Sequence, residues 1–555
     1  MERIKEINNR FENMQSKAPE WGAFLLYFIS HIVLSIYHEN WYDECVAWMI
    51  AKYTSVKDLL FYVPHYEGHP PLWHLILKVF AVMGVNYHVA LSIAVVFFSS
   101  ATVYLILFYS PFPRIIKLAL PFTYYIFYQY GVISRPYCVM MFVFGLLAIT
   151  YKDRNIKVAN YALVLVLLGL TSAYGVIISI GLCMAWFIER LKEYDYKSIQ
   201  LVKNLAKDNV LKGIVAVCGC LFIIGLEFFP YRDTYAMSTA VADRTYSDVI
   251  HNVYYDFLCI IPDTICYDVY DSKGIDLHIV VVIGMLMLIH IYLYGKKKKT
   301  LALFFIPYVL FCLFGATIYL TDHHIGIMNL FFVFWVWVSL DSVCSCENVL
   351  NNRLNVIKNN PLVIKAFSGL FVFAMIYAVS VSFYYSMFSS AKDISDVFES
   401  GKRTAEFIKE NRLTDYKMMA GWLTYDESSY YNVSDSAYTV IPEFGYNIFD
   451  YQEYGCDGQY NLHVILTEEE KDSLLEKWRE IGLPDVIVGE ASLDNVFVDD
   501  KVNFKEDYVY VFSDLSHKIW KDNVENLSIG IYLKRDLAEK LNIKEIPKPV
   551  IVKVR

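Results

Sequence analysis

Charged residues are scarce in this sequence of 555 residues. Asp, Glu, Lys and Arg make up 19% of it and 56% of the residues are hydrophobic, whereas about 25% of the residues of a soluble globular domain are charged. The apolar residues come in long runs separated by short polar links, and each run is near the roughly 20 residues with which a helix crosses a bilayer. The scarcity of charge therefore excludes an ordinary soluble domain and predicts a polytopic helical membrane protein.

Cysteines at metal-binding or redox spacing are also absent. The 11 cysteines are scattered, and no CxxC pair or His/Cys zinc pattern occurs. Cys259 and Cys266 would form a disulfide only if their loop lies outside the cytoplasm. Cysteines inside apolar runs are expected to be small buried side chains; they include Cys183, Cys218, Cys220 and Cys312.

Eleven apolar runs are predicted to cross the membrane. The first follows a charged segment, residues 1–20, which lacks the small-residue cleavage site of a signal peptide, so we expect it to be retained. The predicted transmembrane module is therefore residues 21–385. Its expected spans are residues 21–37, 88–109, 118–133, 138–151, 158–171, 174–189, 210–228, 276–294, 300–320, 325–341 and 362–385.

Basic links set the orientation of these spans. Lys and Arg concentrate in the links 151–157, 189–207 and 295–300, which should face the cytoplasm because positive charge stays inside. The N-terminus then also lies in the cytoplasm, and the expected location is the plasma membrane. Three regions face away from the cytoplasm: the loop 38–87, the loop 229–275 and everything after about residue 386.

This topology requires that the apolar segment 69–84 does not cross the membrane. The segment is short for a span, and Pro70 and Pro71 suit the first turn of a helix. His74 and Lys78 fall four residues apart on one helical face. We therefore predict an amphipathic helix in the membrane interface, with an apolar side made of Trp73, Leu77, Phe80 and Met83.

The chain changes character after residue 385. Residues 395–413 and 467–482 have the periodicity of amphipathic helices. Segments rich in β-branched and aromatic residues predict strands at 461–467, 485–490, 508–512 and 527–535. We expect an extracytoplasmic α/β domain over residues 386–555, which is long enough to build its own core.

An adjacent pair of acids, Asp43 and Glu44, directly follows the first span. Trp41, Tyr42 and Trp48 flank the pair, so the simplest explanation is a capped or solvated helix within an aromatic belt. Two further motifs fall on the same predicted face of the membrane, HYEGHPPL at 65–72 and SRPY at 134–137. Because three such motifs fall on one face of the membrane, a functional site is favoured over a simple aromatic belt.

These motifs together resemble the GT-C superfamily of membrane glycosyltransferases, with the protein O-mannosyltransferases and the aminoarabinose transferases that modify lipid A as the nearest relatives. The acidic pair after the first span, HPPL at the start of an interfacial helix and RPY outside the third span carry the resemblance, and DHHIGIMNLFFVFW at 322–335 adds a weaker match. The resemblance covers the N-terminal half best. It implies inverting transfer of a monosaccharide from a polyprenyl-phosphate carrier to a glycan, lipid or protein on the extracytoplasmic face.

The resemblance also implies roles for individual residues. Asp43 would be the general base that takes a proton from the acceptor hydroxyl, and Glu44 would orient Asp43 or the acceptor. Arg135 presents a fixed fork of donors that can grip the leaving phosphate. The expected transition state resembles an oxocarbenium ion, as in glycosidases. Further donor-binding candidates are Tyr137, His69 and His324.

Simpler explanations exist for each of these donor-binding residues. Arg135 can reach lipid headgroups, Tyr137 can belong to an aromatic belt, and the adjacent His323 and His324 can serve packing at the end of a span. His69 can order the acidic loop without touching a donor.

A divalent metal is the one possible cofactor that the sequence suggests. His65, Glu67 and His69 stand at alternate positions, so an extended strand would point all three side chains the same way as ligands. Pro64 and Gly68 favour a bent loop instead.

The sequence departs from the family in two places. The mannosyltransferase form HPPLGK reads HPPLWH here, so that His74 replaces a lysine. The segment near Arg135 carries no acidic residue, whereas the aminoarabinose transferases have one there. Both departures leave the donor sugar open.

Two other classes of protein compete with a glycosyltransferase. A transporter or flippase places ionisable residues near the middle of the bilayer, whereas the predicted spans are nearly free of them, with Glu227 near one end. A membrane-anchored protein that binds its target through the C-terminal domain would leave the acidic loop unexplained. A glycosyltransferase that uses a lipid-linked sugar is therefore the preferred interpretation.

Overall fold

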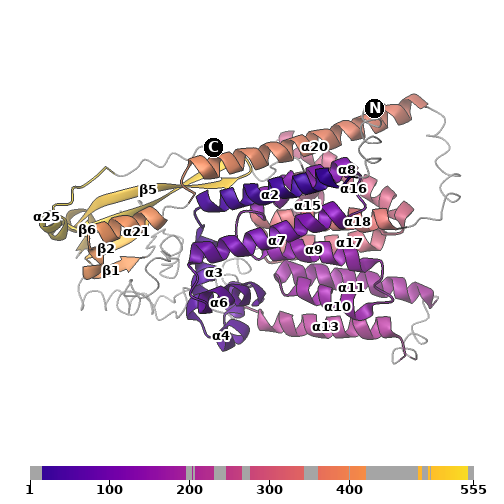
Figure 1. The fold of residues 1–555 in the computed structure, drawn as a ribbon, viewed down its shortest axis with the longest axis horizontal. Helices are drawn as coiled ribbons and strands as arrows, with labels where there is room; N and C mark the ends of the chain where they lie inside the picture. Colours follow the sequence, from indigo (N-terminus) through magenta and orange to yellow (C-terminus); the bar gives the residue numbers. More distant parts are fainter. Residues whose placement is uncertain are drawn as a thin grey trace.

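The apolar runs form a bundle of near-parallel helices, and a small sheet projects from one end of it (Figure 1). We call this end of the bundle the sheet end and the opposite one the far end. The computed structural model describes residues 16–194, 203, 207–230, 245–265, 275–342, 361–398, 401–420, 485–490, 498–499 and 502–547.

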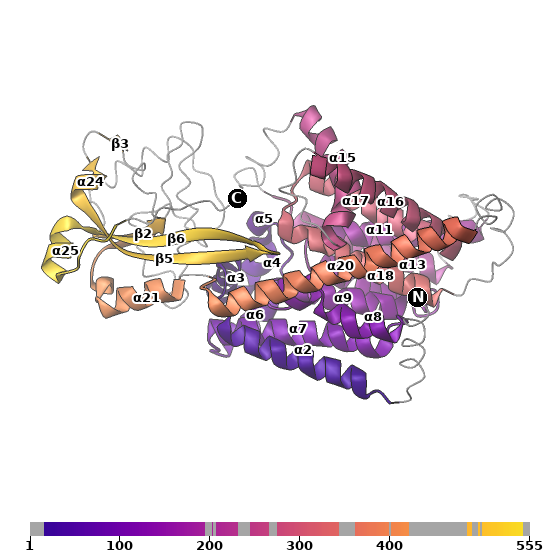
Figure 2. The ribbon, with the colours of Figure 1, turned by 90° about the horizontal axis from the view of Figure 1, so that it is seen from above.

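A set of roughly parallel helices builds the bundle, and the helices of the segment between α2 and α7, which include the predicted interfacial helix, sit at its sheet end (Figures 1 and 2). The helices of the bundle are α2 (Ala18–Tyr37), α7 (Tyr87–Tyr109), α9 (Tyr137–Tyr151), α10 (Val158–Gly169), α11 (Ala173–Glu193), α13 (Asn209–Glu227), α15 (Tyr246–Ile265), α16 (Ile275–Lys298), α17 (Leu301–Thr317), α18 (Asp322–Asp341) and α20 (Pro361–Ser395). The short helices are α3 (Tyr42–Tyr53), α4 (Val56–Phe61), α5 (Pro64–Glu67) and α6 (Leu72–Val82).

Six helices among the described residues are long and apolar enough to cross a bilayer. They are α2, α7, α11, α13, most of α16 and most of α18. Their outer faces are apolar: on α2, the side chains of Leu25, Leu26, Ile29 and Ile36 are 52% to 67% exposed. Such faces favour lipid over water. The protein is therefore a helical membrane protein, although α9, α10 and α17 are shorter than a standard span.

The predicted span 118–133 is not one helix, which corrects the sequence-based expectation. Its residues form the end of α8 (Arg114–Ala119), a 3₁₀ turn η1 (Leu120–Phe122) and a π-helical turn η2 (Tyr125–Gln129). Pro121 lies within this span, removes a backbone donor and interrupts the regular helix. Because α7 and α9 both start at the sheet end (Figure 1), this broken segment carries the chain back across the bundle.

Neighbouring helices bond to the backbone that the broken segment leaves without a helical partner. The Tyr27 hydroxyl of α2 donates to the Ile126 carbonyl at 2.7 Å. On α20, the Ser386 hydroxyl donates to the Phe122 carbonyl at 2.9 Å, and the Ser382 hydroxyl accepts from the Tyr124 amide at 2.9 Å. Irregular backbone in a membrane protein is tolerated where such partners exist.

Helix α15 lies in the segment that the sequence analysis treated only as a loop, residues 229–275. It packs against α16, α17 and α18, and the Tyr308 hydroxyl of α17 donates to the Phe257 carbonyl of α15 at 2.6 Å. Two of its acids, Asp256 and Asp263, are buried. These acids interrupt the apolar run, so the segment does not have the continuous hydrophobicity by which the other spans are predicted. It has the mixed apolar and polar faces of an amphipathic helix.

The segment 69–84 contains the predicted short helix, α6, whose 11 residues span about half a bilayer at 1.5 Å per residue. The predicted faces are wrong in part. His74 is buried together with Trp73 and Leu77, whereas Met83 is exposed. Lys78 donates to the Thr54 carbonyl beyond the end of α3 at 2.8 Å, so this lysine ties two short helices together.

The cysteines follow expectation only in part. Cys183 and Cys312 are buried, but Cys218 and Cys220 are exposed on the apolar surface of α13. Cys259 is buried in α15, and the disulfide considered for it would involve Cys266, which lies outside the described residues.

The C-terminal region contains the predicted sheet and one of the predicted helices. Strands β1 (Met418–Ala420), β2 (Val486–Glu490), β6 (Asn523–Lys534) and β5 (Tyr508–Trp520) lie in that order, with β1 and β2 parallel and the other pairs antiparallel. Helix α21 (Gly401–Glu410) covers the sheet through Ile408. The smaller elements are η3 (Leu413–Asp415), β3 (Val498–Asp499), β4 (Val502–Asn503), α24 (Phe504–Asp507) and α25 (Arg535–Leu541). The expected segments 461–467 and 467–482 lie outside the described residues.

Strands β5 and β6 form a hairpin that is much longer than predicted and that reaches the sheet end of the bundle (Figure 2). The turn consists of Lys521 and Asp522, between the paired residues Trp520 and Asn523. Ile519 belongs to the same hydrophobic core as the helices. The hairpin therefore joins the C-terminal sheet to the bundle by a packed contact.

Candidate functional site

Four segments far apart in the sequence meet at the sheet end. They are the chain after α2, the SRPY segment before α9, the start of α18 and strand β5. Asp43 forms an ion pair with Arg135, and the rings of Tyr137 and His323 lie 6.2 Å apart. Lys518 of β5 lies over the ring of Trp41 at 4.4 Å. The fold thus brings three of the sequence motifs together with a residue from the C-terminal sheet.

Glu44 is fully buried and is occupied by structural bonds. It is the third residue of α3, where an acid favours the positive end of the helix dipole, and it accepts from the Trp41 amide at 2.8 Å. It also accepts from the Ser134 amide at 2.6 Å, from His38 at 3.0 Å and from the Asn40 side chain at 3.2 Å. A carboxylate has about four lone-pair sites. Glu44 therefore has a positioning role, holding the acidic loop to the SRPY segment.

His38 extends this buried network to α20. Its Nδ1 donates to Asp393 at 2.9 Å, and its Nε2 donates to Glu44 at 3.0 Å. Burial opposes a charge on this imidazole, but the carboxylates of Asp393 and Glu44 outweigh burial and hold the pKa of His38 well above its usual value. His38 is therefore a buried cation between two acids, and it anchors the acidic loop.

Asp43 points away from this network toward Arg135. The Asp43 side chain is 23% exposed and the Arg135 side chain 13% exposed, so both are reachable from outside. The Arg135 guanidinium also lies 5.8 Å from the ring centroid of Trp41. The adjacent acids thus have different environments: Glu44 is enclosed, and Asp43 faces an accessible cation.

Lys518 and His323 both lie next to Trp41, near the pair of Asp43 and Arg135. The ring of His323 lies 6.1 Å from that of Trp41, and the cations Arg135 and Lys518 are close enough to act on His323 electrostatically. Sequence reasoning missed Lys518 because the predicted strand ended at Phe512. The only local signal for it was a lysine between apolar and aromatic residues in HKIWK, which many surface strands share.

Tyr137 and His324 lie beneath this group. Tyr137 is buried, and its hydroxyl is close enough to the Arg135 guanidinium to interact with it electrostatically. His324 accepts from the Thr321 amide at 3.2 Å and packs against Tyr174 with ring centroids 4.6 Å apart. These contacts cap the first turn of α18. His324 is thus placed as a helix cap, whereas His323 is the histidine nearer Arg135 and Trp41.

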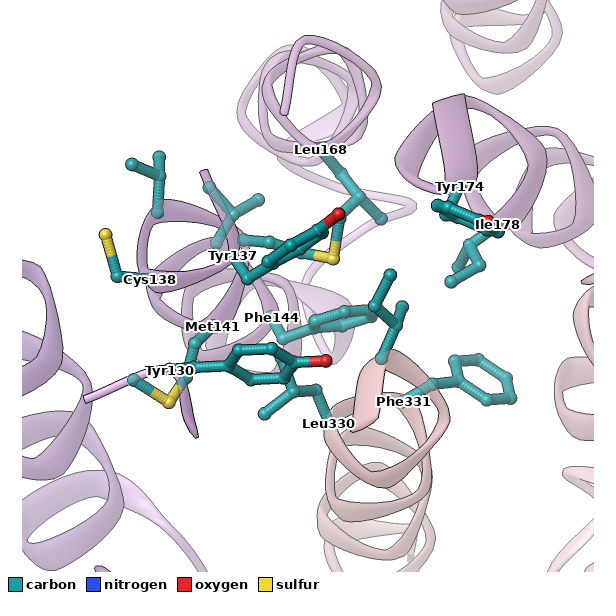
Figure 3. Close-up of a cluster of buried hydrophobic side chains, with 14 of the residues drawn as sticks. Tyr130, Tyr137, Cys138, Met141, Phe144, Leu168, Tyr174, Ile178, Leu330 and Phe331 are labelled. Atoms are coloured by element: carbon teal, nitrogen blue, oxygen red, sulfur yellow. The ribbon is translucent and has the colours of Figure 1, made fainter. Parts of the chain in front are cut away.

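Apolar and aromatic side chains pack around Tyr137. Figure 3 shows Tyr130, Tyr137 and Tyr174 packed among the side chains of Met141, Phe144, Leu168, Ile178, Leu330 and Phe331. The Tyr130 hydroxyl donates to the His323 carbonyl at 2.6 Å. A side chain at Gly326 would collide with the ring of Tyr125, so glycine is needed there for α18 to pack this closely.

The three residues considered as metal ligands do not lie on an extended strand. His65 and Glu67 belong to the helical turn α5, and Gly68 has a left-handed backbone, which confirms the bent backbone that Pro64 and Gly68 favoured. His65 instead bonds to the Phe229 carbonyl at 2.7 Å. Among the described residues, no three His, Cys, Asp or Glu side chains come close enough to hold a metal ion.

His69 lies near His74 and His323 without taking part in a metal cluster. Burial lowers the pKa of His69 below its usual value, so its imidazole is neutral at pH 7. Its Nδ1 atom is buried and has no hydrogen-bond partner within the described part of the chain. A neutral imidazole with an unused nitrogen can donate to or accept from a polar ligand.

Chemically, the site combines the partly exposed carboxylate of Asp43, two cations and the neutral imidazole of His69 at the end of an apolar bundle. Such a set can take a proton at Asp43 and can hold an anion at Arg135. No protein-family model, curated protein or solved structure matches this chain.

Proposed function

We propose that this protein is a glycosyltransferase of the GT-C type, which transfers a monosaccharide from a polyprenyl-phosphate carrier to an acceptor hydroxyl. The observation that carries the proposal is the accessible pair of Asp43 and Arg135 at one end of a membrane bundle, beside a Glu44 that is fully occupied by structure. The acid pair of the sequence thereby divides into one reactive and one positioning residue.

The proposed reaction is a displacement at the anomeric carbon of the sugar. The acceptor oxygen forms a bond to this carbon while Asp43 takes the hydroxyl proton. The bond between the anomeric carbon and the phosphate oxygen breaks, and its electron pair leaves with the phosphate. Arg135 stabilises the phosphate through charge-assisted hydrogen bonds. Attack from the side opposite the phosphate inverts the configuration of the sugar.

The ion pair of Asp43 and Arg135 suits the resting state of such an enzyme. Arg135 must turn part of its donor fork from Asp43 to the donor's phosphate, which it can grip in the same bidentate way. Asp43 then loses its cationic partner and becomes a stronger base. Donor binding would therefore prepare the carboxylate for the acceptor.

The orientation of the bundle supports a lipid-linked donor. The last turn of α16 carries Lys296–Lys298, and Lys298 donates to the Ser342 carbonyl just beyond the end of α18, opposite the end of α18 that carries His323. Basic links prefer the cytoplasmic side. The sheet end would then face the extracytoplasmic side of the plasma membrane. A sugar donor that reaches this side while staying in the membrane is a polyprenyl-phosphate sugar, because nucleotide sugars are made in the cytoplasm.

Transport of a polar or lipid-linked substrate is the second candidate, and Asp256 and Asp263 favour it. These acids are buried among helices, as the ionisable residues of transporters are. Asp263, however, forms an ion pair with Lys521 at 2.7 Å. Transport would not require Asp43, so one variant separates the two functions.

A donor-release assay tests the proposal. The purified protein is incubated in proteoliposomes with a panel of radiolabelled polyprenyl-phosphate monosaccharides, and the free polyprenyl phosphate is measured. We expect release from one panel member, and a loss of about 100-fold or more in Asp43→Asn. Asp58→Asn is the matched control, because Asp58 lies in the same loop and bonds to the Ser55 hydroxyl. Release that is equal in Asp43→Asn and wild type would contradict the role of Asp43.

A further inference from the structure

We propose that Lys518, on strand β5 of the C-terminal sheet, binds the phosphate of the donor together with Arg135. This inference rests on the function proposed above and adds a residue to its site. It also gives the C-terminal sheet a part in donor binding, because the hairpin supplies one of the two cations.

Trp41 is the common neighbour of the two cations. The Nζ atom of Lys518 lies 4.4 Å from its ring centroid, and the guanidinium carbon of Arg135 lies 5.8 Å from the same point. Trp41 immediately precedes α3, which carries Asp43. Lys518 is half-buried, so its ammonium group can reach a ligand at the mouth of the site while its stem packs on the ring.

The turn of the hairpin is fixed at three places, which determines where Lys518 lies. Lys521 donates to Asp263 of α15 at 2.7 Å, and both side chains are buried. The Lys521 amide donates to the Tyr124 hydroxyl at 2.8 Å, and the Ser389 hydroxyl of α20 donates to the Lys521 carbonyl at 2.8 Å. A side chain on so well anchored a strand is held close to one position, as a binding site requires.

A second cation suits a site that holds a phosphate. Arg135 is already paired with Asp43, so a phosphate bound by Arg135 alone would compete with that carboxylate for the same guanidinium. Lys518 adds an ammonium group beside the same tryptophan ring. The phosphate of a lipid-linked sugar can then be bound by a cation from each side of the contact between the bundle and the hairpin.

The test is direct binding of polyprenyl phosphate, without its sugar, to the full-length protein in detergent, measured as the ligand-dependent shift in melting temperature over a concentration series. We expect Lys518→Met to weaken binding about 10-fold or more, because a charge-assisted bond to phosphate is lost while the stem is kept. Lys518→Arg should retain most of the affinity. Lys544→Met is the control, since Lys544 is an exposed lysine of the same C-terminal region.

The outcomes separate this inference from the proposed function. If the wild type binds polyprenyl phosphate and Lys518→Met binds it equally well, Lys518 only packs against Trp41, and the inference is overturned while the proposed function stands. If Lys518→Arg binds as weakly as Lys518→Met, charge is not what Lys518 supplies, and the inference also fails. If the wild type does not bind polyprenyl phosphate at all, the proposed function itself fails.

Discussion

The two ends of the helical bundle hold their charged groups in different ways. At the far end, the charges form pairs of two side chains: Arg154 with Glu189 at 2.7 Å, both partly exposed, and Arg114 with Glu20 at 2.6 Å, both buried. At the sheet end, His38 lies buried between two acids, Glu44 and Asp393, and Lys521 lies buried against Asp263. Both ends therefore bury charge, but at the sheet end the buried charges are linked into a larger network.

This difference indicates where the fold maintains a defined geometry. Burying a charge is costly unless partners surround it, so the sheet end keeps its buried charges by supplying several donors and acceptors to each. The far end also contains a cavity of about 200 Å³, lined in part by Arg154 and Asp341, but its ion pairs join nearby helices only. The elaborate network at the sheet end positions Asp43 and Arg135.

Of the substitutions that test this comparison, Lys521→Met should have the largest effect on the free energy of unfolding. The substitution leaves Asp263 buried without its cation and should lower the free energy of unfolding by about 3–5 kcal/mol. Thermal unfolding in detergent measures the loss. The double variant Lys521→Met/Asp263→Leu should recover most of it, and a double variant as unstable as the single one would show that the pair is not the cause.

The pH dependence of His38→Gln should show a smaller effect. Folding raises the pKa of His38, so the stabilisation is fully present below the unfolded pKa of about 6.5 and is lost as pH rises through the folded pKa. It amounts to about 1.4 kcal/mol for each pH unit by which folding raises the pKa.

Melting temperatures of wild type and His38→Gln from pH 6 to pH 9 measure this contribution. We expect the advantage of the wild type to be largest near pH 6 and to shrink toward pH 9. An advantage that grows with pH would mean that His38 is neutral in the folded protein.

The smallest effect is expected at the far end. Glu189→Gln removes the charge that pairs with Arg154 at a partly exposed position, so the free energy of unfolding should fall by no more than about 1 kcal/mol. Binding of polyprenyl phosphate should not change, because the site lies at the other end of the bundle. A loss of binding in this variant would contradict the claim that the far end takes no part in binding the donor.

Much of the bundle follows from the sequence, because long apolar runs have few alternatives to helices. The sequence does not reveal α15 or the broken segment 118–133, since both depend on partners from distant helices. Asp256 and Asp263 become tolerable inside the bundle only through tertiary contacts. Pro121 of the broken segment is visible in the sequence, but no local pattern shows that the side chains of Tyr27 and Ser386 bond to the backbone of this segment.

The candidate site shows the same division. The sequence motifs and the alternating direction of the predicted spans placed Asp43, Arg135 and Tyr137 at the same end of the bundle, and they lie there in the structure. Only the family resemblance assigned different roles to Asp43 and Glu44. The local sequence pattern gives no reason for the difference, because it does not show that the Ser134 amide and His38 bond to Glu44. Lys518 depends on how the hairpin docks, which no local pattern encodes.

The most direct test of the central claim compares Asp43→Asn with Glu44→Gln in one experiment. Both the release of polyprenyl phosphate from the donor and the melting temperature are measured for each variant. We predict that Asp43→Asn keeps the melting temperature of the wild type within a few degrees and loses release, whereas Glu44→Gln lowers the melting temperature clearly because four donors lose a charged acceptor. A stable, inactive Glu44→Gln beside an active Asp43→Asn would contradict the account.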